Sequence, residues 1–218
     1  MSKRPSSRMP PRLAAVLLSS ALAAGCALSA DRDPSGTSSM SEPTTTTVEA
    51  AGGRLTASFA YTPRTGAVEV HYRFDNVGES PLAVFDRGDR HAVLVGRQHG
   101  GAVGAPHFQE EAPGDVVLRH AARPLPEPPP TVPPTPLAAR VEPGASLAGE
   151  FLFAPPTERE PQRIRWCLGV APFDTEGFTQ PEEVDGVEVW RGSFDLAARQ
   201  TLLCTPWFDV AAQRFEAG

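Results

Sequence analysis

Alternation of apolar and polar positions is the main pattern of the chain beyond residue 50. The clearest run is 68–75, whose apolar positions are Val68, Val70, Tyr72 and Phe74. A period of two residues is that of a β-strand with one buried face. Similar runs, separated by Gly, Pro, Asn and Asp, occupy residues 55–59, 82–85, 92–96, 116–119, 137–141, 147–153, 164–170, 187–190 and 201–210. Eight or nine of these ten runs are predicted to form short strands.

Turn and helix signals agree with an all-β fold. Pro143 and Gly144 suit the second and third positions of a type II turn, which predicts a strand on either side. Only residues 194–203 favour a short helix. We therefore predict an antiparallel β-sandwich over residues 51–218.

A resemblance to a known fold rests on three features. They are the strand from Val68, its exit Asn76-Val77-Gly78 and the later Val141-Glu142-Pro143-Gly144 turn. Over residues 54–170 the chain resembles the immunoglobulin-like modules of bacterial surface and periplasmic proteins. The resemblance implies an immunoglobulin-like sandwich and says nothing of a ligand.

A proline-rich segment covers residues 124–136, in which eight of 13 residues are proline. As polyproline II it would extend about 40 Å, at about 3.1 Å per residue. Two interpretations follow. The segment is either a crossover between the two sheets or a docking strip for an aromatic-lined groove on a partner.

The amino terminus has the pattern of an export signal. Basic residues Lys3, Arg4, Arg8 and Arg12 precede an apolar run over 13–24. Twelve helical residues span about 18 Å, which is short of the roughly 20 residues that a bilayer requires. Residues 1–25 are therefore predicted to be a signal peptide.

The end of that run, Leu22-Ala23-Ala24-Gly25-Cys26, resembles the lipobox of bacterial lipoproteins. The resemblance implies cleavage before Cys26, lipidation of its thiol and a membrane anchor of two or three acyl chains. Ala27 follows the cysteine, where Asp would favour inner-membrane retention in enteric bacteria. The implied location is the outer membrane, facing the periplasm.

Residues 26–50 are rich in Ser, Thr, Pro and acidic residues and contain few apolar ones. Such a segment buries too little surface to offset its ordering entropy, so we predict a flexible tether. The 193 residues from Cys26 onward carry 16 basic and 26 acidic side chains, a formal charge of −10. That charge disfavours nucleic acid and anionic lipid as partners and leaves membrane attachment to the lipid.

The two other cysteines, Cys167 and Cys204, are expected in an oxidising compartment. A disulfide between them would close a loop of about 37 residues and contribute roughly 3 to 4 kcal/mol. Two separately buried thiols or a redox pair are the alternatives. Neither a CxxC motif nor a paired histidine accompanies the cysteines.

Motifs for catalysis and metal binding are weak. All five histidines lie within residues 71–120 without metal-ligand spacing, and His91, His99 and His107 form the best available trio. There is no GxSxG motif, so Ser146 and Ser193 are the remaining candidate nucleophiles. We predict no cofactor.

These observations favour a non-catalytic binding or structural module that a lipid anchor presents to another envelope protein. A periplasmic metal-binding or small-ligand-binding protein is the alternative. An envelope hydrolase is a further one.

Overall fold

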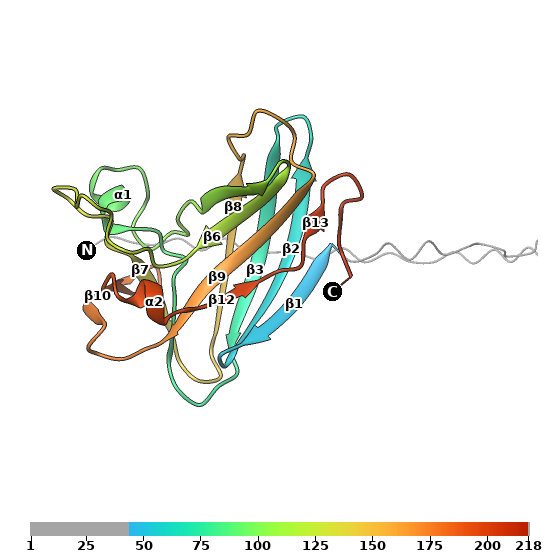
Figure 1. Cartoon of the computed structure of the whole chain (residues 1–218). Helices are drawn as coiled ribbons and strands as arrows, with labels where there is room; N and C mark the ends of the chain where they lie inside the picture. Colours follow the sequence, from blue (N-terminus) through green and yellow to red (C-terminus); the bar gives the residue numbers. More distant parts are fainter. Residues whose placement is uncertain (1–43, 218) are drawn as a thin grey trace, which may run out of the picture. The chain divides into compact units, whose positions relative to one another are not determined.

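The computed structural model describes residues 44–217, which form an all-β domain of two sheets (Figure 1). The smaller sheet has the order β1-β2-β3-β8 and is antiparallel throughout. Its strands are β1 (Thr45–Ala50), β2 (Gly53–Thr62), β3 (Ala67–Asn76) and β8 (Ser146–Phe153). The predicted all-β class is confirmed.

The larger sheet is built around the long strand β9 (Arg163–Pro172), which crosses the whole domain (Figure 1). One side of β9 pairs with β6 and then β4, and the other side pairs with β13 and β12. The remaining strands extend from these neighbours in the order β10-β11-β7-β4, with β5 on β6 and β14 on β13. The bounds are β4 (Leu82–Val84), β5 (His107–Ala112), β6 (Asp115–His120), β7 (Leu137–Val141), β10 (Phe178–Val184), β11 (Val187–Gly192), β12 (Thr201–Cys204), β13 (Phe208–Asp209) and β14 (Arg214–Phe215).

The larger sheet is mixed, because β6 runs parallel to β9. The prediction of a purely antiparallel fold is wrong at this pair. A period of two shows which face of a strand is buried but not whether the neighbouring strand runs parallel or antiparallel. The sequence pattern therefore could not predict the parallel pair.

The main core lies between the sheets, where the inward rows of both meet. In β3 the apolar positions of the alternating run are all buried. From the larger sheet, Trp166 is fully buried and packs against Tyr72 and Phe151, with ring centroids 4.9 and 5.4 Å apart. A second apolar cluster covers the opposite face of the larger sheet and includes Phe85, Phe178 and Leu196. Leu196 comes from the short helix α2 (Leu196–Arg199), inside the predicted helical segment.

One predicted strand is wrong. Residues 92–96 fall in and just after the helix α1 (Arg90–Leu94). The Asp89 side chain accepts a hydrogen bond from the backbone N–H of Ala92 at 2.9 Å, which is an N-cap contact. The N-cap contact and the following turn therefore favour a helix over the strand that the short apolar run predicted.

The predicted tether also needs correction at its end. Residues 45–50 form β1, which pairs along its full length with β2, whereas the prediction assigned 26–50 to a flexible segment. Its Thr-rich sequence suits an edge strand of alternating partial burial. The signal peptide 1–25, Cys26 and the rest of the tether to residue 43 lie outside the described residues.

The proline-rich segment 124–136 joins β6 to β7, both in the larger sheet, so it does not cross between the sheets. Most of it is exposed. Its end is held against the loop after β4, because Leu137 donates to the carbonyl of Gly88 at 2.9 Å and Arg90 donates to that of Thr135 at 2.9 Å. This contact brings the prolines beside α1.

A candidate binding cavity beside helix α1

A cavity of about 540 Å³ lies where three segments meet. Its walls come from the loop over residues 85–106, from the adjoining ends of β5 and β6, and from Pro134 and Pro136 of the proline-rich segment. The volume is within the range of small-molecule sites, about 300–1,000 Å³.

A buried ion pair fixes the start of the loop. Asp86 and Arg87 are both buried, and the Arg87 Nη2 donates to Asp86 Oδ2 at 3.1 Å. Tyr72 also donates its hydroxyl to that oxygen, at 2.5 Å, from β3. Burial raises the pKa of Asp86 despite the nearby guanidinium, and burial also raises the pKa of Tyr72 well above its usual value. The loop is thus attached to the core through polar contacts.

Arg87 and Gln98 hold the loop closed on itself. Arg87 Nη1 donates to the carbonyl of Gly101 at 2.6 Å, and Gln98 Nε2 donates to that of Arg87 at 2.7 Å. Gly88 has φ +66°, and a Cβ on Gly104 would lie 2.5 Å from the Gly88 Cα. The close approach of two backbone segments therefore requires glycine at residue 104.

His120 anchors the far end of the same loop. Its Nδ1 accepts from the Trp166 indole N–H at 3.0 Å, so its Nε2 carries the hydrogen that is donated to the carbonyl of Gly104 at 2.8 Å. Burial is the main cause that lowers the pKa of His120 to about 4. The ring is a neutral structural link between the core and the cavity wall.

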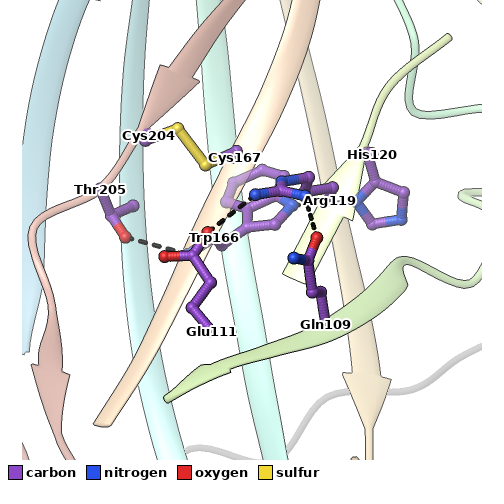
Figure 2. The surroundings of a disulfide bond; sticks show 8 residues. All are labelled: Gln109, Glu111, Arg119, His120, Trp166, Cys167, Cys204 and Thr205. Carbon is purple, nitrogen blue, oxygen red and sulfur yellow. Dashed lines mark hydrogen bonds and ion pairs between the residues drawn. A yellow bond between two sulfur atoms is a disulfide. The ribbon is translucent and has the colours of Figure 1, made fainter. Parts of the chain in front are cut away.

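The charged groups of the lining are mostly cationic. The lining contains three arginines, Arg97, Arg119 and Arg123, and one carboxylate, that of Asp89. Arg119 is already paired, with Glu111 at 2.9 Å and Gln109 at 2.6 Å (Figure 2). Asp89 caps α1.

Arg123 lies beside a histidine at the cavity wall. Its Nη1 is 3.2 Å from Nδ1 of His107 and 3.3 Å from Nε2. Partial desolvation and the Arg123 charge lower the pKa of His107, which favours a neutral imidazole at this wall.

The predicted histidine trio is only partly brought together. His99 and His107 line the cavity, but His91 does not. His120 joins them, with both ring nitrogens already hydrogen-bonded. Residues 44–217 contain no group of three or more His, Cys, Asp or Glu side chains that could hold a metal ion.

Within residues 44–217, neither candidate nucleophile is hydrogen-bonded to a histidine. Ser146 donates to Asp75 at 2.6 Å and accepts from Arg73, all on the exposed face of the smaller sheet. Ser193 donates to Asp195, next to α2. Neither arrangement has the base that a serine hydrolase requires.

Cys167 and Cys204 are directly opposite each other on β9 and β12, with sulfur atoms 2.05 Å apart and Cα atoms 4.0 Å apart. The pair lies at disulfide distance, as predicted. Cys167 is also in register with Arg119 on β6, so the disulfide borders the Arg119 contacts (Figure 2).

Sequence reasoning missed the residues that build the cavity, namely Asp86, Arg87, Gln98, Arg97, Arg123 and His120. The available signal was Asp86-Arg87-Gly88-Asp89, which reads as ordinary turn chemistry and contains an Arg-Gly-Asp tripeptide. The tripeptide is not presented for adhesion, because Arg87 is only 4% exposed.

Neither helix in residues 44–217 is long and apolar enough to cross a membrane. No protein family, curated protein or solved structure matches the chain.

Proposed function

We propose that the chain is a lipid-anchored protein of the bacterial envelope whose all-β domain is a non-catalytic binding module. The cavity beside α1 is the observation that carries this proposal, because it is of ligand size and its walls are fixed by buried polar contacts. A site whose walls are already ordered loses little entropy when a ligand binds.

The anchor and the immunoglobulin-like architecture are part of the same proposal. The lipobox-like residues 22–26 support lipidation of Cys26. Two sheets packed around one apolar core support an immunoglobulin-like sandwich, although the parallel β6–β9 pair departs from the antiparallel pattern. The module would be presented to a ligand, or to a protein carrying it, at the outer membrane.

Cavity binding is tested with the purified full chain and a mixed set of neutral and anionic small molecules, by ligand-observed NMR. At least one compound is expected to bind. Ala105→Trp, which places an indole at the cavity wall, should weaken that binding at least tenfold. Ala148→Trp, on the exposed face of β8, should leave it unchanged. Absence of binding across the set, or binding that Ala105→Trp does not affect, would refute the proposal.

Anchoring is tested by mass spectrometry of the protein recovered from cell membranes. The expected amino terminus is Cys26 carrying diacylglycerol. An unmodified Cys26, or cleavage elsewhere, would refute the lipoprotein assignment and leave the cavity result intact.

A further inference from the structure

The cationic groups at the cavity are the feature that goes furthest beyond a generic binding site. The chain as a whole has a formal charge of −6. At least seven arginines of residues 44–217 have a carboxylate within 4 Å, as Arg54 does with Glu49 and Arg199 with Asp174. Arg97 and Arg123 have no such carboxylate within the described residues, although acidic side chains are abundant.

The placement of these two arginines matters more than their lack of partners, since the exposed Arg64 also has no described ion pair. Arg97 and Arg123 come from segments on either side of β5 and β6, and both line the same cavity. Asp89, the one carboxylate of the lining, uses its Oδ1 to cap α1, so the lining carries more cationic than anionic groups. Two guanidiniums facing one space favour an anion and repel a cation.

Apolar residues form another part of the lining and narrow the chemistry further. Val103, Pro106, Pro134 and Pro136 contribute walls without charge. A ligand with a second charged group would place that group against these walls without a partner, which costs desolvation energy. A ligand with one anionic group and an apolar body fits both halves of the lining.

We propose that the cavity binds a small organic anion whose single carboxylate or phosphate group is held by Arg97 and Arg123. The apolar part of the ligand packs against Val103 and the prolines. This inference rests on the proposed function, because it names the ligand class of the same cavity.

The test uses isothermal titration calorimetry on the purified full chain at low ionic strength. Benzoate and phenyl phosphate are the anionic probes, benzamide is the neutral probe of matched shape, and inorganic phosphate lacks the apolar body. At least one of the two aromatic anions is expected to bind at least tenfold more tightly than benzamide and than inorganic phosphate. The comparison of benzoate with phenyl phosphate identifies the preferred head group.

Variants assign the effect to the two arginines. Arg97→Gln combined with Arg123→Gln should weaken the better anion at least tenfold and leave benzamide unchanged. Arg64→Gln, in the exposed turn after β2, is the matched control and should leave all affinities unchanged. Circular dichroism checks that each variant is folded.

Each contrary result has a distinct meaning. Equal binding of benzamide and the anions, or an unchanged anion affinity in the double variant, would overturn the anionic ligand but keep a binding module. Inorganic phosphate binding as tightly as phenyl phosphate would overturn the apolar half of the site. If neither these probes nor the broader compound set binds, the proposed function fails as well.

Discussion

The buried side chains between the two sheets are apolar, whereas buried polar side chains lie beneath the cavity. The main core consists of side chains such as Phe74 and Trp166, which come from regular strands and are fully buried. The loop over residues 85–106 has apolar contacts through Phe85 and Val103, but it is also attached through Asp86, Arg87 and His120, each at least 96% buried. Apolar packing is non-directional and tolerates small shifts, whereas hydrogen bonds fix geometry. The region between the sheets therefore supplies stability, and the polar contacts of the loop define the geometry of the cavity.

The largest effect is expected from an apolar truncation between the sheets. Phe74→Ala removes a ring that lies directly over Gly53, where a Cβ would be 2.4 Å from Phe74 Cε2. Because so close-packed a site can collapse only partly, the free energy of unfolding should fall by about 4 kcal/mol. Urea denaturation followed by tryptophan fluorescence measures it.

Leu152→Ala is the matched control, since Leu152 is 71% exposed on the edge strand β8. It should change the free energy of unfolding by less than about 0.5 kcal/mol. Similar losses in the two variants would show that the region between the sheets does not carry the stability assigned to it.

A smaller and more local effect is expected beneath the cavity. Arg87→Ala leaves the Asp86 carboxylate buried without its counter-charge and the Gly101 carbonyl without its donor. Breaking a buried pair in this way costs about 3 kcal/mol. Hydrogen exchange should show the loss first in residues 85–106, while β2 and β3 stay protected.

Arg54→Ala provides the comparison for that pair, because its contact with Glu49 is also an arginine–carboxylate pair but is exposed. Water screens the exposed charges, so this variant should keep the exchange pattern of the unmodified chain. Uniform loss of protection across both sheets in Arg87→Ala would contradict a locally held loop.

The same contrast explains what the sequence could predict. Strands such as β2 and β3 follow from alternation, because a half-buried strand imposes a period of two on its own residues. The turn at Pro143 and Gly144, which joins β7 of the larger sheet to β8 of the smaller one, follows from turn chemistry, and Gly144 has φ +73°. In these elements the local pattern and the tertiary packing agree.

The cavity could not be predicted in this way, because its contacts join residues far apart in the chain. Tyr72 meets Asp86 from another sheet, and Trp166 meets His120 across 46 positions. The strands β5 and β10 were missed for a related reason. Their exposed residues carry many charges, so hydrogen bonding to a neighbour rather than burial makes them strands.

The pH dependence of His120 is the last way to sharpen the comparison. The folded pKa is about 4, whereas an unperturbed histidine titrates near pH 6.5. Between these values the unfolded chain binds a proton that the folded chain does not. Acid therefore favours unfolding, and the stability from the neutral ring is complete above about pH 6.5 and is lost as the pH falls toward 4.

The expected loss from this one group is about 2 kcal/mol between pH 7 and pH 5, at about 1.36 kcal/mol per pKa unit. Urea denaturation at several pH values measures it, with His120→Gln as the matched variant. Glutamine can still accept from the Trp166 indole and donate to the Gly104 carbonyl, but it does not titrate. Its stability should therefore fall less steeply than that of the unmodified chain over this interval. Parallel curves for the two proteins would mean that His120 is not a neutral buried link, and the polar attachment of the cavity wall would then have to rest on Asp86 and Arg87 alone.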